Sequence, residues 1–159
     1  MKFTARDTGF DFTGRDTLAL FLDENAGQIE HKGLPEAISH IADRANLGFF
    51  TGKSGESLFV PLSGHPALIL MGLGKAGEIT RESLRNAAAG VIDACKKKKI
   101  ASLHVFVPVL TGIDEKDVLA ALAEGMYLGN YGFDRYKTRR DDVDAPLETG
   151  CVLVSEIQA

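Results

Sequence analysis

The chain has 159 residues, of which 45% are hydrophobic and 25% charged, and its formal net charge at pH 7 is −4. This length suits one domain, and the composition is that of a globular protein and excludes a disordered one. No stretch approaches the roughly 18 apolar residues of a membrane span, and the N-terminal residues lack the apolar core of a signal peptide. Two cysteines, Cys95 and Cys151, make no disulfide framework, which favours a cytoplasmic location.

Apolar patterning predicts strands alternating with helices. The predicted strands cover residues 16–22, 57–62, 67–73, 101–107 and 151–154, and the predicted helices cover 35–45, 80–97 and 114–130. Thr80 and Asp114 are expected N-caps of the second and third helices. The strands at 67–73 and 101–107 are almost continuously apolar, which is typical of strands covered on both faces. The alternation predicts an α/β layered sheet, mostly parallel in its second half.

The segment GLGKAG at residues 72–77 is a literal GxGxxG sequence between a strand and a helix. In dinucleotide-binding folds such glycines let the backbone approach a pyrophosphate at the helix N-terminus. Two details favour a structural turn instead: the helix begins only at Thr80, and no acidic residue closes the next strand. If the turn does bind an anion, the candidate residues are Gly72, Gly74, Lys75 and Gly77.

The sequence contains no recognisable pattern of metal ligands or catalytic side chains. The histidines lie in separate segments, neither cysteine has a partner within four residues, and there is no Gly-x-Ser-x-Gly elbow. His104, inside an apolar strand, is predicted to be a buried structural histidine. The lysine run at 96–99 is interpreted as a solvated helix end, and Asp141 and Asp142 offset the basic residues at 137–140. Nucleic-acid binding is therefore disfavoured.

An aromatic-rich stretch surrounds the end of the third predicted helix. It contains Met126, Tyr127, Tyr131, Phe133 and Tyr136. This stretch is either the edge of the hydrophobic core or an interface, since Tyr and Phe are enriched at interfaces.

Two stretches together resemble one family, the leucyl aminopeptidases or M17 peptidases. GLGK at 72–75, followed by TRESLRNAA at 80–88, is similar to a strand–turn–helix in the N-terminal domain of that family. The second stretch resembles the closing signature of the same domain, and many positions keep their order and spacing. Its residues are Glu124, Gly125, Leu128, Gly129, Tyr131, Phe133, Asp134, Tyr136, Lys137 and Thr138.

The resemblance implies a three-layer α/β/α sandwich of macro-domain type with a mixed, largely parallel sheet, formed by residues 1–159 as one domain. It also implies a parent enzyme, a cytosolic and usually hexameric aminopeptidase that uses two divalent metal ions, Zn²⁺ or Mn²⁺. In that family the metal ligands and catalytic residues lie in a C-terminal domain, whose Asn-Thr-Asp-Ala-Glu-Gly-Arg signature is missing from this sequence. We therefore expect no catalytic residue, metal or cofactor in this chain, and no enzyme activity from it alone.

The function expected from the resemblance is non-catalytic: support of oligomer assembly and of access to a neighbouring active site. The expected partners are the chain's own catalytic domain and further copies in a hexamer, without nucleic acid or membrane. Two alternatives stay open. One is a free-standing macro-like module that binds a nucleotide or ADP-ribose through the turn at 72–77, and the other is a structural subunit for a separately encoded catalytic chain.

Overall fold

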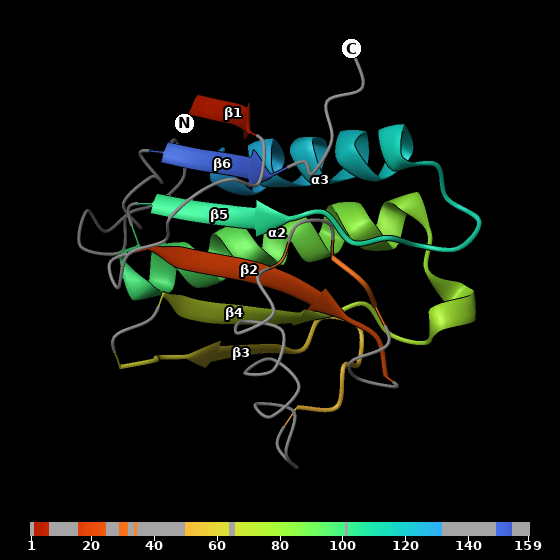
Figure 1. Ribbon diagram of the computed structural model, residues 1–159, viewed down its shortest axis with the longest axis horizontal. Coiled ribbons are helices and arrows are strands. Elements are labelled where there is room, and N and C mark those ends of the chain that lie inside the picture. The colour runs from red at the N-terminus through yellow and green to blue at the C-terminus, as the bar shows by residue number, and fades with distance from the viewer. Residues whose placement is uncertain are drawn as a thin grey trace, which may run out of the picture.

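The computed structural model describes residues 2–6, 16–24, 29–31, 34, 50–63, 66–100, 102–131 and 149–153. Within these ranges six strands form one sheet in the order β1-β6-β5-β2-β4-β3 (Figure 1). Their bounds are Lys2–Arg6 for β1, Thr17–Leu22 for β2, Ser57–Val60 for β3, Ala67–Gly72 for β4, Ser102–Phe106 for β5 and Thr149–Leu153 for β6. The pair β3–β4 is antiparallel and the other four pairs are parallel, so the predicted mixed, largely parallel sheet is confirmed.

Two long helices lie on the same face of this sheet (Figure 1). They are α2 at Arg81–Lys98 and α3 at Glu115–Asn130, and a short 3-10 helix, η1 at Ala76–Glu78, precedes α2. The bounds of α2 and α3 agree within one or two residues with the helices predicted at 80–97 and 114–130. The helix predicted at 35–45, and with it the second helical layer of the sandwich, falls outside the described residues.

The N-termini of the two helices differ from each other. Thr80 forms a capping box with Ser83: its hydroxyl accepts from the Ser83 N–H at 3.2 Å, and its own N–H donates to the Ser83 hydroxyl at 2.7 Å. Asp114 occupies the N-cap position of α3 as predicted, but its side chain makes no capping hydrogen bond. The prediction that Asp114 is the N-cap residue of α3 is therefore confirmed, but its side chain does not provide the capping hydrogen bond.

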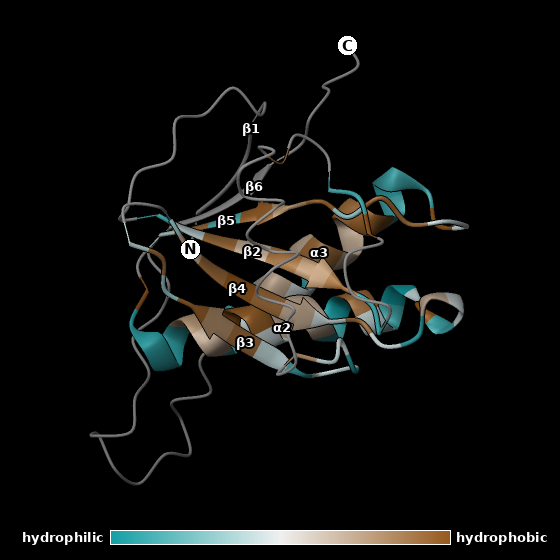
Figure 2. Cartoon of the chain, turned by 60° about the horizontal axis from the view of Figure 1, so that its bottom comes forward, coloured by the Kyte–Doolittle hydropathy of each residue, from teal (hydrophilic) through white to brown (hydrophobic). Residues whose placement is uncertain are grey.

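The central strands bury both of their faces, as their continuous apolar sequences predict. Successive side chains of a strand point to opposite faces, so Phe21 and Met71 pack towards the helices while Leu20 and Leu70 pack on the other face. Figure 2 shows hydrophobic colour along β2 and β4. Every residue of β2 is buried. A strand buried in this way can hold the turns at its carboxyl end in fixed positions.

Candidate functional site

The turn at residues 72–77 leaves the carboxyl end of β4, where α/β sheets commonly bind ligands. Its first three N–H groups are already used within the chain. Gly72 donates to the Glu56 carbonyl at 2.8 Å, Leu73 to the Leu22 carbonyl at 2.8 Å, and Gly74 to the Gly52 carbonyl at 2.9 Å. Because an anion-binding turn needs N–H groups aimed at the ligand, these three are not available for a phosphate.

Close backbone packing accounts for the glycines of this turn. A Cβ at Gly72 would lie 2.0 Å from the Lys53 carbonyl oxygen, and Gly74 has a φ of +85°. Lys75 is exposed, and a Cβ at Gly77 would meet nothing within 4 Å. Gly72 and Gly74 thus build a structural turn against the loop at 50–56, while anion binding at Lys75 and Gly77 stays a prediction.

That loop is held by Glu56, a residue that the sequence patterns do not single out. The Glu56 carboxylate accepts from the Thr51 hydroxyl at 2.6 Å and from the N–H groups of Thr51 and Lys53 at 3.0 and 3.2 Å. These hydrogen bonds lower the pKa of Glu56, the bond from the Thr51 hydroxyl most of all. A Cβ at Gly52, which has a φ of +75°, would lie 1.9 Å from the Asp23 carbonyl oxygen, so this loop also has a tightly packed structural role.

The signature residues on α3 fall into two groups, and the first group packs against α2. A Cβ at Gly125 would lie 2.1 Å from the Arg85 carbonyl oxygen, and one at Gly129 would lie 2.9 Å from the Ala89 Cα. Glycines four residues apart thus let the two helix backbones approach closely. Glu124 adds an ion pair across the same contact, since its Oε2 accepts from Arg85 Nε at 3.0 Å and from Arg85 Nη2 at 2.8 Å.

The second group points away from the core. Leu128 is 61% exposed and Tyr131 is 66% exposed, and the neighbouring Tyr127 is 63% exposed. Met126, from the same aromatic-rich stretch, is fully buried. The stretch is therefore partly core and partly surface. The remaining signature residues lie outside the described residues: Phe133, Asp134, Tyr136, Lys137 and Thr138.

Comparison with known proteins identifies the family. A profile described as "Cytosol aminopeptidase family, N-terminal domain" matches residues 19–140. The chain belongs to this family. A probable cytosol aminopeptidase of Protochlamydia amoebophila is 34% identical over 101 residues, which cover 62% of this chain and 20% of that protein. One of Microcystis aeruginosa is 33% identical over 154 residues, which cover 94% of this chain and 31% of that protein.

Solved structures agree with the fold of this cytosol aminopeptidase domain. A tomato leucine aminopeptidase mutant superposes with a TM-score of 0.71 at 19% identity, covering 100% of this chain and 33% of that one. The bottromycin maturation enzyme BotP gives a TM-score of 0.59 at 23% identity, covering 87% of this chain and 27% of that one. The chain thus spans about a third or less of these relatives. No helix in its described part is long and apolar enough to cross a membrane.

The lysine run of this M17 domain is a set of structural contacts. Lys96 Nζ donates to the Gly129 carbonyl at the end of α3 at 2.8 Å. Lys97 pairs with Asp93 at 2.8 Å, and the Lys98 ammonium lies 5.2 Å from the centre of the Phe59 ring. Lys99 ends α2 in a left-handed conformation, with a φ of 55°. The predicted solvated helix end is thus exposed at Lys97, Lys98 and Lys99, while Lys96 is half-buried against the end of α3.

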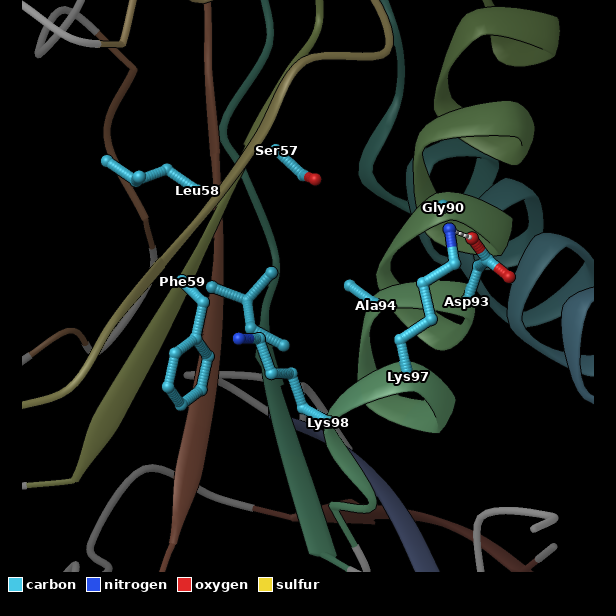
Figure 3. Close-up of a pocket in the computed structure, with 9 residues that line it drawn as sticks. Ser57, Leu58, Phe59, Gly90, Asp93, Ala94, Lys97 and Lys98 are labelled. Carbon is cyan, nitrogen blue, oxygen red and sulfur yellow. Dashed lines mark ion pairs between the residues drawn. The ribbon is translucent and has the colours of Figure 1, made fainter. Parts of the chain in front are cut away.

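A hollow of about 320 Å³ lies between β3 and α2 (Figure 3). The Asp93–Lys97 ion pair lies on one side of it, and Lys98 beside Phe59 on the other. A second hollow, about 200 Å³, lies beyond the carboxyl ends of the strands and includes the buried Asp23. It is smaller than the roughly 300–1,000 Å³ of most ligand pockets. Ser57 also lines the first hollow, but its hydroxyl lies apart from the Asp93–Lys97 ion pair (Figure 3).

The described side chains of His104 and Cys95 are buried and have structural surroundings. Among the described residues no group of three or more His, Cys, Asp or Glu could hold a metal ion. His104 is buried as predicted, with its Nε2 3.3 Å from Asp16 Oδ1. Burial raises the pKa of the Cys95 thiol to about 12, so it is not a nucleophile at neutral pH.

His31 has a structural role that sequence reasoning missed, because a lone histidine in a polar segment carries no pattern. Its Nε2 accepts a hydrogen bond from the Phe21 N–H at 3.0 Å, and its backbone bridges to Pro108. The pairing of β2 with β5 ends at Ala19. Beyond that point the His31 imidazole, in place of a strand carbonyl, accepts the hydrogen bond from the Phe21 N–H. Burial lowers the pKa of His31 to about 4, which keeps the ring neutral and able to accept.

Proposed function

We propose that this chain, as a single domain, is the N-terminal domain of a metal-dependent leucyl aminopeptidase, and that a separate catalytic domain hydrolyses the peptide. One observation carries the proposal: the family's N-terminal profile matches residues 19–140, while the chain covers only 20–31% of the two relatives described above. The described residues offer no metal cluster of their own. The location that goes with this function is the cytoplasm.

In this proposal the divalent metal ions belong to the catalytic domain. One related structure is the bottromycin maturation enzyme BotP in complex with Mn. The chain described here would contribute surfaces, which support a homo-oligomer and shape access to the active site. Its signature residues fit that division, because Gly125 and Gly129 build the domain itself while Leu128 and Tyr131 face outward.

Aminopeptidase assays of the purified chain test the first half of the proposal. With leucine amide and added Mn²⁺ or Zn²⁺ we expect no hydrolysis above the buffer rate. Turnover that copurifies with the chain through two different columns, and that a chelator abolishes, would overturn the proposal.

The source genome tests the second half. We expect an M17 catalytic domain to be encoded either in frame after the Ala159 codon or in a separate gene whose product copurifies with this chain. A genome with neither would overturn the proposal.

Titration by calorimetry tests the nucleotide alternative. Because the N–H groups of Gly72, Leu73 and Gly74 are used within the chain, we expect no saturable heat from ADP-ribose, NAD or ATP up to millimolar concentrations. Saturable binding that Lys75→Ala, a substitution at an exposed position, weakens would favour the alternative.

A further inference from the structure

Helix α3 carries a second apolar stripe besides the one that faces the sheet. We call it the outer face of α3, and its residues are Ala120, Ala123, Glu124, Tyr127, Leu128 and Tyr131. They recur at intervals of three and four residues, which places them along one side of a helix. The three largest are 61–66% exposed, whereas Val118, Leu122 and Met126 on the opposite side are buried to 1% or less.

The outer face is almost free of net charge. Between Val118 and Tyr131 the only charged residue is Glu124, and its carboxylate is paired with Arg85, which also contacts Glu82. A shallow hollow of about 560 Å³ lies beside this ion pair, lined by Arg85, Ala123, Glu124, Tyr127 and Leu128. Apolar residues around a hollow, with a paired charge at the rim, resemble the composition of protein interfaces.

We propose that the outer face of α3 is the surface on which this domain docks against the catalytic part of its parent aminopeptidase. This inference rests on the function proposed above. The aligned region makes up only 20–31% of the two relatives described, so a much larger body belongs to the same polypeptide in each of them. Two domains on one chain meet at high effective concentration. An apolar patch of modest size therefore suffices to hold them together.

The residues of the signature support this partner over a small ligand or a second copy. Gly125 and Gly129 are explained by the contact with α2, whereas Leu128 and Tyr131 leave more than 60% of their surface exposed. These two belong to the same stretch that resembles the aminopeptidase family. Exposed apolar side chains at these positions fit a partner in the rest of that enzyme, which the greater length of the relatives supplies.

Cysteine labelling in two contexts tests the proposal. Leu128→Cys is placed in the outer face, and Val109→Cys, 44% exposed and outside α3, serves as the matched control. Each variant is prepared as this chain and as the whole aminopeptidase, and maleimide labelling is followed by peptide mass spectrometry, which separates these sites from Cys95 and Cys151. We expect the labelling rate at position 128 to be at least roughly tenfold lower in the whole enzyme than in this chain. A tenfold factor corresponds to a free-energy difference of about 1.4 kcal/mol between the covered and the open surface. The rate at position 109 should not change.

The outcomes separate this inference from the function on which it rests. Equal labelling rates at position 128 in the chain and in an active whole enzyme would overturn the docking surface and leave the proposed function standing. Protection that rises with the concentration of the isolated chain, together with dimers in sedimentation, would overturn it in favour of a second copy. Absence of any aminopeptidase that contains or binds this domain would overturn both.

Discussion

Helices α2 and α3 lie side by side on one face of the sheet, yet their solvent sides have opposite compositions. The exposed side of α2 carries the charged residues Arg81, Glu82, Asp93 and Lys97, whereas the later turns of α3 expose two tyrosines and a leucine. Burial against the sheet and against α3 explains the apolar residues of α2, whereas Tyr127, Leu128 and Tyr131 at the end of α3 stay more than 60% exposed. The apolar pattern of α2 is therefore accounted for within the domain, whereas the exposed apolar residues of α3 fit the docking surface proposed above.

The largest expected effect compares the two sides of α3 directly. Leu122→Ala empties a fully buried position and should lower the free energy of unfolding by about 2–5 kcal/mol. Leu128→Ala, on the outer face, should change it by less than about 0.5 kcal/mol in the isolated chain. Urea denaturation measures both, and a large loss for Leu128→Ala would show that the outer face serves the domain's own core.

The same small substitution on the two helices gives the next largest difference. Gly125→Ala places a Cβ 2.1 Å from the Arg85 carbonyl oxygen, and we expect a loss of about 1–3 kcal/mol, despite the better helix propensity of alanine. Gly90→Ala is the control on α2, because its Cβ meets only the flexible end of Met71. It should be neutral or raise the stability by up to about 1 kcal/mol. Equal effects at both positions would mean that the helices do not approach as closely as described.

Acid should destabilise the chain through a group outside the two helices. The folded-state pKa of His31 is about 4 against an ordinary value of 6.5, so the unfolded state takes up the proton first. Stability is complete above pH 6.5 and is lost as the pH falls towards 4, by about 2 kcal/mol at pH 5.

The difference in unfolding free energy between the wild type and His31→Gln isolates this contribution, because the other titrating groups cancel. The variant should lack the acid-dependent loss between pH 7 and 5. An identical pH slope in both proteins would contradict the assignment to His31.

The smallest expected effect concerns the two C-caps. Lys99 ends α2 in a left-handed conformation, while Tyr131 ends α3 with a φ of −71°. Lys99→Gly should therefore raise the unfolding free energy by about 0.5–1 kcal/mol, and Tyr131→Gly should bring no such gain. Thermal denaturation of the two variants makes this comparison, and a gain at position 131 would contradict it.

The sequence predicts the parts of this fold whose causes are local. The spacing of Leu84, Ala88, Val91 and Ile92, together with the cap at Thr80, sufficed to place α2, and the continuous apolar run at 67–73 sufficed to predict a strand covered on both faces. The insertion of β6 between β1 and β5 could not be predicted. It pairs residue 149 in parallel with residues 2 and 102, and no local pattern encodes the pairing of strands so distant in the chain.

The candidate site shows the same limit. The late start of the helix at Thr80 already favoured a structural turn, but only the fold shows that Glu56, Leu22 and Gly52 take its N–H groups. The aromatic-rich stretch was open to two interpretations for a similar reason. Helical spacing groups Met126 with Leu122, but it does not say whether the neighbouring Tyr127 faces core or solvent until α2 is in place beside α3.

The lysine run shows that four identical neighbours need not be equivalent. A reagent that acetylates lysines would remove the donor to the last turn of α3 at Lys96 and an exposed ion pair at Lys97. At Lys98 it would remove a charge held near an aromatic ring, and at Lys99 it would leave the backbone hydrogen bonds to Cys95 and Lys96 intact. One chemical modification, applied at four successive positions, would therefore affect the contact with α3 at Lys96, an exposed ion pair at Lys97 and the sheet edge at Lys98, and at Lys99 no side-chain contact within the described part of the chain.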